Sequence, residues 1–172
     1  MRFLERRPGR AAGEARVVIA DDRGAPVAHG LWFSGRPGRG LRPWADLVVT
    51  DHAVIADVVS ELGPGGSIMV AYGGDETERA LRRRVPPPAT PLGLVLLEAG
   101  CRWFKDWYYP EGGREGGTKL QGTIPLDASR RVRAEAALAE EIDRFLEASP
   151  RPEDRGRARA ALEILGRAGQ RR

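Results

Sequence analysis

Residues 86–122 read PPPATPLGLVLLEAGCRWFKDWYYPEGGREGGTKLQG, and this stretch decides the fold. Its first part predicts an apolar helix, because Thr90 is a good N-cap residue and Pro91 suits the first helical position. The apolar run continues to Ala99, and Gly100 favours the end of the helix. The stretch therefore begins with a helix that is buried along much of its surface.

The rest of this stretch predicts two strands joined by a glycine-rich loop. Residues 101–109 are aromatic enough for a strand, and residues 118–124 form the next one. By alternation, one face of the first strand carries Trp103, Lys105, Trp107 and Tyr109, and the other carries Arg102, Phe104, Asp106 and Tyr108. Aromatic rings interleaved with Arg102 and Lys105 could stack on the bases of a single-stranded nucleic acid. The sequence favours the alternative that these side chains complete the core.

The residues upstream predict strands at 16–20, 27–33, 45–50 and 67–72, and a helix at 52–62. The first two strands flank the turn sequence DDRG and indicate a β-hairpin. Asp51 is the expected N-cap of the helix. The strand at 67–72 (SIMVAY) is almost wholly apolar, which is typical of a strand covered on both faces.

The remaining elements are helical. Asp75 and Glu78 have the spacing of a capping box for a polar helix that runs to about residue 84. Residues 128–148 and 153–168 predict a helical hairpin that packs on the sheet or serves in self-association.

Early antiparallel strands followed by β-α-β units predict an α/β (α+β) fold: a mixed, largely antiparallel sheet flanked by helices. We expect residues 1–125 to form this domain and residues 126–172 to form a C-terminal helical extension, packed on it or used in assembly. A homodimer is plausible on this basis.

The amino-acid composition limits the classes of protein to which the chain can belong. The chain has 172 residues, 41% hydrophobic and 30% charged, as expected for a globular domain. No apolar run approaches the roughly 20 residues that span a bilayer, and the basic N-terminus lacks the apolar segment of a secretory signal. A single cysteine, Cys101, excludes an intramolecular disulfide framework. We therefore expect a cytoplasmic protein without a membrane partner.

Arginine supplies 26 of the 28 basic residues, and the chain has no asparagine. Scarce amides and loop prolines suit a protein of a thermophile. Codon bias in a GC-rich genome explains the arginine content equally well. The two lysines, Lys105 and Lys119, stand out against this background.

The element order and residues 86–122 resemble the C-terminal half of the GNAT-type N-acetyltransferases, in which a leucine-rich helix ending leads into the last two antiparallel strands. Residues 96–101 (LLEAGC) stand at that place. The phrases PPATPLG and FKDWYYPEG are also similar to an uncharacterised prokaryotic or archaeal family of unknown function near this fold. The resemblance covers residues 45–124. It implies an acyl-CoA-dependent N-acyltransferase that uses acetyl-CoA or another acyl-CoA and a small-molecule amine or peptide acceptor.

The resemblance also suggests site residues. Glu111, Glu115 and Tyr109 would face the acceptor amine as catalytic groups, where a carboxylate can remove its proton. The cofactor would be held by Tyr72, Gly73, Gly74 and Asp75, after the apolar strand. In the GNAT enzymes a glycine-containing strand-to-helix turn binds the coenzyme A pyrophosphate through backbone N–H groups. Here the matching residues 49–53 (VTDHA) contain no glycine and contain an acid.

Other chemistries find little support. His29 and His52 are far apart and have no H-x-x-x-H or Cys–His partner, so no metal site is expected. Cys101 follows a helix end and is interpreted as a small buried hydrophobe rather than a nucleophile. Two alternatives to the acyltransferase are thus a non-catalytic ligand-binding or assembly module on the same fold and, less favoured, a single-stranded nucleic-acid binder.

Overall fold

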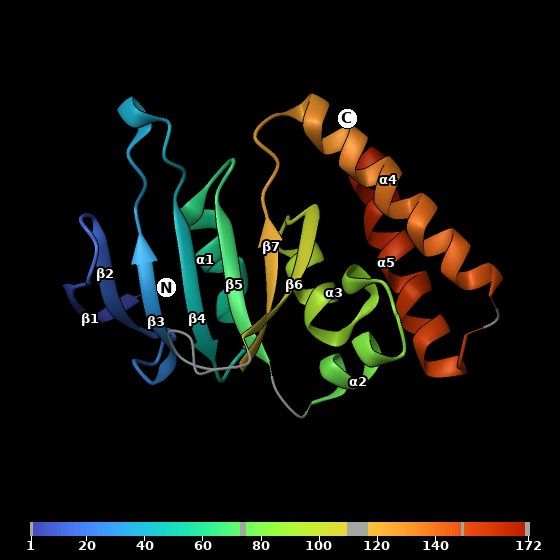
Figure 1. Ribbon diagram of the computed structural model, residues 1–172, viewed down its shortest axis with the longest axis horizontal. Coiled ribbons are helices and arrows are strands. Elements are labelled where there is room, and N and C mark those ends of the chain that lie inside the picture. Colours follow the sequence, from blue (N-terminus) through green and yellow to red (C-terminus); the bar gives the residue numbers. More distant parts are fainter. Residues whose placement is uncertain (1, 73–74, 110–116, 149, 171–172) are drawn as a thin grey trace.

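The computed structural model describes residues 2–72, 75–109, 117–148 and 150–170 (Figure 1). Its strands are β1 (Arg2–Pro8), β2 (Glu14–Ala20), β3 (Pro26–Phe33), β4 (Trp44–Val49), β5 (Ser67–Tyr72), β6 (Trp103–Tyr109) and β7 (Gly117–Thr123). Its α-helices are α1 (Val54–Leu62), α2 (Glu76–Arg82), α3 (Pro91–Glu98), α4 (Ala128–Glu147) and α5 (Pro152–Gln170), with short 3₁₀ turns η1 (Pro37–Arg39) and η2 (Pro87–Ala89).

The strands form one seven-stranded sheet in the order β1-β2-β3-β4-β5-β7-β6. Only the β4–β5 pair is parallel, and the other five pairs are antiparallel. The predicted mixed, largely antiparallel sheet flanked by helices is therefore confirmed. Its likeness to the GNAT fold stays a prediction.

The first strand was not anticipated from the sequence. Residues Arg2–Pro8 (RFLERRP) pair with β2, although five of the seven side chains are exposed. The strand is held by the ladder and by one aromatic contact, in which the Phe3 ring meets the Trp32 ring edge-on at 5.2 Å. A solvated edge strand carries too weak an apolar alternation to be recognised in a sequence.

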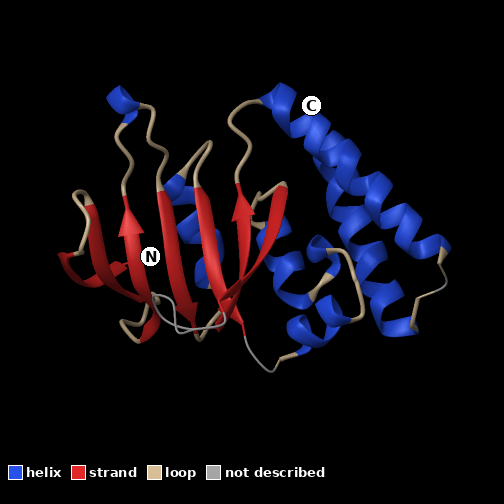
Figure 2. Cartoon of the chain, viewed as in Figure 1, coloured by secondary structure: helices blue, strands red, loops and turns tan. Residues whose placement is uncertain are grey.

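The helices α1 and α3 cover one face of the sheet, and the main core lies between them (Figure 2). In β5, Ile68, Val70 and Tyr72 point into this core, while Ser67, Met69 and Ala71 are only half-buried. The strand is thus fully buried on one face and partly buried on the other, so the predicted cover on both faces is met only in part. Among the described residues no helix lies over the opposite face, which we call the open face (Figure 2).

A second core joins the C-terminal helices to α2, α3 and η2. Leu138 and Ile142 of α4 and Leu165 of α5 pack there with Leu97 of α3 and Val85. Figure 1 shows α4 and α5 side by side at one end of the sheet. The predicted division of the chain at residue 125 and a role of the hairpin in self-association stay predictions.

The helix starts follow the sequence signals closely. The carboxylates of Asp75 and Asp127 and the hydroxyl of Thr90 accept backbone N–H bonds at the starts of α2, α4 and α3, as N-caps do. The exception is α1, which begins at Val54. The Asp51 carboxylate binds Ala53 N at 2.9 Å, before the helix starts.

Candidate functional site

A buried ion pair lies on the open face of the sheet. Lys119 Nζ of β7 is 2.6 Å and 2.8 Å from the two carboxylate oxygens of Asp46 on β4. The lysine side chain is 2% exposed and the aspartate side chain 13%. Removing two charges from water is costly, and a buried ion pair stabilises a protein no better than apolar side chains of similar volume. A buried pair is therefore a candidate functional feature.

The sheet register brings these two residues together across β5. Lys119 pairs with Ala71, and Asp46 pairs with Met69, two residues earlier on the same strand. Residues that are opposite one another, or two apart, share a face of the sheet. The residue opposite Lys119 on β5 is the small Ala71, and the lysine side chain reaches across this strand to Asp46 on β4.

Polar side chains of β6 and β7 extend this feature toward the sheet edge. Trp107 Nε1 donates a hydrogen bond of 2.7 Å to Gln121 Oε1. The Lys105 ammonium lies 3.7 Å from the centre of the Trp107 ring, in the geometry of a cation–π contact. We refer to Asp46, Lys119, Gln121, Trp107 and Lys105 as the open-face cluster.

The open-face cluster contains both lysines of the chain. Every other basic residue is arginine. A lysine ammonium is a compact charge that approaches a carboxylate or an aromatic ring where a planar guanidinium does not fit in the same way. The two exceptions to the arginine usage thus lie on neighbouring strands of one face, which points to a chemical requirement at that place.

The parallel strands beside this cluster are not paired along their whole length. The β4–β5 ladder runs from Trp44–Ser67 to Leu47–Val70. The last two residues of β4 and of β5 lie beyond it, although both strands continue to Val49 and Tyr72. The ladder between these two strands therefore ends before their carboxyl ends.

The turns that follow these strands carry carboxylates. Asp51 occupies the turn between β4 and α1 and binds Ala53 N, and Asp75 caps α2 by binding Glu78 N at 3.0 Å. Each carboxylate occupies backbone N–H groups that a phosphate would need and repels a second anion. A pyrophosphate bound near either residue would therefore meet a carboxylate.

Tyr72 ends β5 on the helix-covered face. Its hydroxyl donates to the Asp106 carboxylate on β6, and its carbonyl accepts a 2.8 Å bond from the Thr118 hydroxyl. Burial first, and then the bond to Asp106, raise the pKa of the Tyr72 hydroxyl above its usual range. The side chain therefore stays protonated and ties β5 to β6.

The remaining predicted site residues are placed as follows. Tyr109 ends β6 opposite Gly117 of β7, at the carboxyl end of β6. Glu111, Glu115, Gly73 and Gly74 lie outside the described residues. The assignment of catalytic and cofactor-binding roles to these residues stays a prediction.

The expectation that the aromatic strand completes the core holds for only one of its faces. Phe104 packs against both cores, whereas Trp103 is 42% exposed and belongs to the open face. Arg102 is buried, donates to Glu135 of α4 at 2.9 Å and to two carbonyl oxygens. Arg102 is thus unavailable to a nucleic acid, contrary to that alternative.

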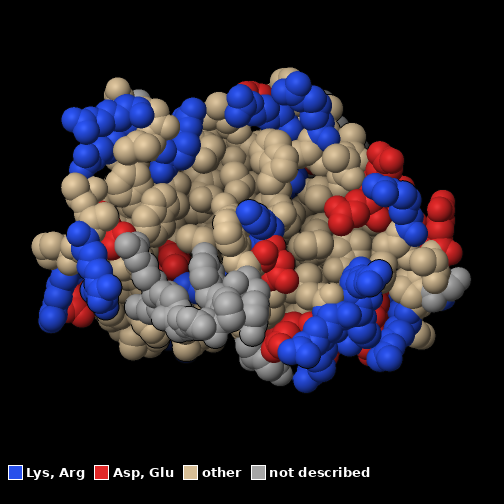
Figure 3. Space-filling model, in the orientation of Figure 1, with Lys and Arg blue, Asp and Glu red and all other residues tan. Residues whose placement is uncertain are grey.

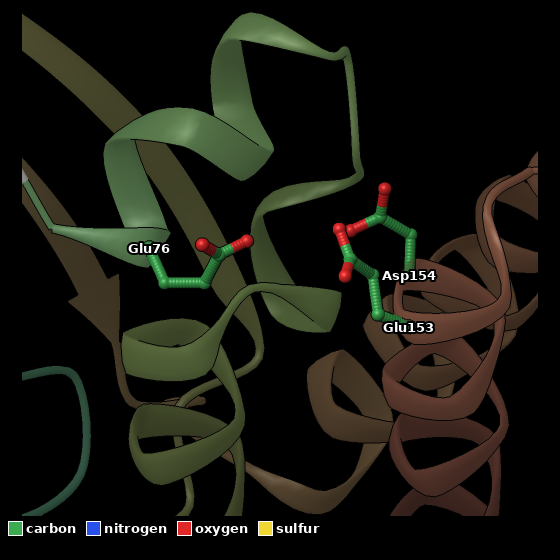
Figure 4. Close-up of side chains that lie close together, drawn as sticks. All are labelled: Glu76, Glu153 and Asp154. Carbon is green, nitrogen blue, oxygen red and sulfur yellow. The ribbon is translucent and has the colours of Figure 1, made fainter.

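The acidic residues Glu76, Glu153 and Asp154 are close enough to share a cation (Figure 4). Arginines already neutralise them: Arg83 binds Asp154 through two bonds of 2.9 Å, and Arg157 binds it at 2.5 Å. Arg83 also reaches Glu76 at 2.8 Å. We call Glu76, Arg83, Asp154 and Arg157 the hairpin cluster, and it joins α2 to α5 as a structural ion-pair network.

The sequence singles out three of the five members of the open-face cluster. Lys105 and Lys119 are conspicuous by composition and Trp107 by its place in the aromatic strand, but Asp46 and Gln121 are not. Asp46 is one polar residue inside an apolar strand, Trp44–Val49 (WADLVV), and that interruption is the signal that could have identified it. Its partner is 73 residues away in the sequence, so only the sheet register reveals the pair.

None of the described helices is both long enough and apolar enough to cross a membrane.

Fold and site together define a mixed α+β domain with an open sheet, one face of which carries a buried ion pair and aromatic side chains. Residues 1–149 match the family model described as "Protein of unknown function (DUF1122)", and the chain belongs to this family. The expectation of an uncharacterised family is thereby confirmed.

A solved structure shares the fold. The crystal structure of a protein of unknown function from Aquifex aeolicus VF5 superposes with a TM-score of 0.71 at 26% sequence identity, over 91% of this chain and 87% of that one. No curated protein matches the sequence.

Proposed function

We propose that this chain is a small-molecule-binding domain whose ligand lies on the open face, over the open-face cluster. The observation that carries the proposal is the placement of both lysines on neighbouring strands of that face, one buried against Asp46 and one stacked on Trp107. A purely structural sheet face needs neither charge, because apolar side chains of similar volume stabilise it as well or better.

The cluster indicates the chemistry of the ligand. Asp46 pairs with Lys119, and the Lys105 ammonium lies on the Trp107 ring, so the described members of the cluster carry one more positive than negative charge, which suits an anionic group of the ligand. Gln121 supplies an amide that bonds to polar ligand groups, and Trp107 supplies apolar area. A small carboxylate that also carries an amide has these complementary features.

N-acetylglycine, with one carboxylate and one amide, is a suitable probe. Titration of the ¹⁵N-labelled full chain should shift the indole N–H resonance of Trp107 at millimolar ligand. Lys105→Met should weaken binding about tenfold, because it removes one charge-assisted contact. Arg144→Met on α4 removes the same charge far from the cluster and should leave the titration unchanged. An unmoved indole resonance, or equal losses in both variants, would contradict the proposal.

Acyl-CoA-dependent N-acyl transfer is the second candidate, and one observation favours it: the β4–β5 ladder ends after Leu47–Val70. Strands that separate leave backbone amides for a ligand, as the resemblance implies. In this proposal Glu111, Glu115 and Tyr109 face the acceptor amine, and residues 72–75 face the donor. Asp51 and Asp75 count against the donor's pyrophosphate at the two turns.

Calorimetric titration with acetyl-CoA decides between the two candidates. Binding at millimolar ligand or below supports acyl transfer. Binding that appears only in Asp51→Gly shows that the carboxylate closes the phosphate turn and supports the non-catalytic module. Absence of binding in both chains removes the enzyme and leaves the ligand-binding function to be judged by the lysine variants.

A further inference from the structure

A pocket of about 470 Å³ lies at the end of the sheet where β4 and β5 begin and α4 starts. This volume is within the range of small-molecule sites. Its charged walls are Arg42, Arg130 and Arg133, and its apolar surface includes Trp103 and Leu126. We call it the arginine pocket.

Backbone hydrogen bonds hold the walls of the arginine pocket together. Gly65 N donates to the Ile124 carbonyl at 3.2 Å, and Ile124 N donates to the Gly66 carbonyl at 2.9 Å. Gly65 has a φ of +77°, and a Cβ there would lie 3.2 Å from Leu126 and 3.3 Å from the Arg42 stem. The glycine thus allows the Arg42 stem and Leu126 to pack closely in a pocket fixed by the sheet.

The arginines of the pocket are not neutralised as those of the hairpin cluster are. Arg130 is 3.6 Å from its exposed partner Asp127. The side chains of Arg42 and Arg133 have no ion pair or hydrogen bond within the described part of the chain. Figure 3 shows Lys and Arg side chains gathered along this edge of the molecule. Guanidinium groups around one hollow attract an anion and suit the planar, bidentate recognition of phosphate.

The aromatic wall adds a second requirement for the ligand. The Trp103 side chain belongs to the open face and is one of the few large apolar side chains with more than 40% exposure. An exposed indole beside guanidinium groups offers a stacking surface for a flat ring. Phosphate and aromatic base occur together in a nucleotide.

We propose that the arginine pocket binds a mononucleotide, with its phosphate at Arg133 and Arg42 and its base on Trp103. This site goes beyond the proposed function. Arg42 and Gly65 precede β4 and β5, so the pocket lies at the opposite end of these strands from Val49 and Tyr72. A six-residue strand separates the two ends by about 20 Å.

Calorimetry on the full chain at low salt tests the site with AMP, adenosine and ribose 5-phosphate. AMP should bind about tenfold more tightly than either fragment, because only AMP carries both the base and the phosphate. Equal affinities for AMP and ribose 5-phosphate would overturn the stacking role of Trp103. Absence of AMP binding at millimolar concentration would overturn the site.

Matched variants locate the binding. Arg133→Gln should weaken AMP binding about tenfold, since it removes a charge-assisted contact to phosphate. Arg144→Gln lies about three turns further along α4 and removes the same charge, so it should leave the affinity unchanged. Equal losses would mean non-specific attraction and contradict the pocket. A single-stranded oligonucleotide that binds where AMP does not would replace the proposal with a nucleic-acid surface.

Discussion

The two clusters of charged side chains in this protein differ in their cations and in their surroundings. The hairpin cluster uses arginine, whose planar fork binds Asp154 through two parallel bonds and also reaches Glu76. It lies between α2 and α5, beside the second core. The open-face cluster uses lysine and lies on a face that no described helix covers.

This difference separates a structural use of buried charge from a functional one. Arginine forks that join two helices fix how those helices pack, because several bonds must form at once. The contact of the Lys119 ammonium with Asp46 instead joins two strands of the same sheet across β5. We infer that the hairpin cluster is retained for assembly of the chain and that the open-face cluster is retained for a ligand.

The strongest test of the comparison is Asp154→Asn. The Asp154 side chain is 3% exposed and accepts bonds from Arg83 and Arg157. Its loss of charge leaves two guanidinium groups without their central partner, so the free energy of unfolding should fall by about 3–5 kcal/mol. Urea denaturation followed by circular dichroism measures the change.

Glu153→Gln is the matched control for this variant. Glu153 precedes Asp154 on the same helix turn, but its side chain is 55% exposed and its distance to Arg83 is 3.5 Å. An exposed pair contributes little to stability. The control should therefore unfold at the same urea concentration as the native chain. Similar effects of the two substitutions would contradict a structural role specific to Asp154.

Substitutions of Lys119 and Asp46 should change the free energy of unfolding less than Asp154→Asn does. The double substitution tests whether this ion pair is needed for stability. Lys119→Met alone removes the ammonium partner of the Asp46 carboxylate and should cost about 2 kcal/mol. Lys119→Met combined with Asp46→Leu removes both charges and should restore stability or exceed it. The double variant should nevertheless lose binding of N-acetylglycine. A double variant that is less stable than the single one would make this pair structural, like the hairpin cluster.

The sequence predicts contacts between residues that are close together in the chain, but not contacts between residues that are far apart in it. The caps at Asp75, Thr90 and Asp127 are local, because each side chain bonds to an amide three residues away. Those helix starts could be predicted for that reason. The partners Asp46 and Lys119 meet through a strand order that no local pattern specifies.

The other differences between prediction and structure arise because the sequence does not show which faces of a strand are buried. The apolar strand Ser67–Tyr72 suggested cover on both faces, but its half-buried side chains are small or flexible and face the open side. The edge strand Arg2–Pro8 has the opposite problem, since its solvated side chains conceal a strand that pairs with β2 along its length except at a bulge between Phe3 and Glu5. In both cases the strand's position in the sheet, which is a tertiary property, decides the exposure.

Acid should weaken the hairpin cluster, because the pKa values of its carboxyl groups are lowered in the folded state. The hydrogen bond from Arg83, with that from Arg79, lowers the pKa of Glu76 to about 2, and Arg83 lowers the pKa of Asp154 as well. A carboxyl whose pKa is lower in the folded state stabilises the protein above its unfolded pKa and loses that contribution as the pH falls toward the folded value. Stability should therefore decline from about pH 5 to pH 2, and less steeply in Asp154→Asn. Parallel curves for the two chains would contradict this origin.

The rate at which the Cys101 thiol is alkylated measures how often the helix-covered side of the sheet opens. This rate should change less than the other properties tested. Burial raises the pKa of this thiol to about 12, so the native chain should resist iodoacetamide at pH 8. The next residue, Arg102, donates a hydrogen bond of 2.9 Å from its Nε to Glu135 Oε1 and so holds α4 against the sheet. Glu135→Gln should accelerate alkylation modestly by loosening α4, whereas the double substitution at positions 46 and 119 should not. Mass spectrometry of timed samples measures the rates. Faster alkylation in the open-face variant would mean that the lysine pair also holds the helix side of the fold together, and the distinction between the two clusters would be lost.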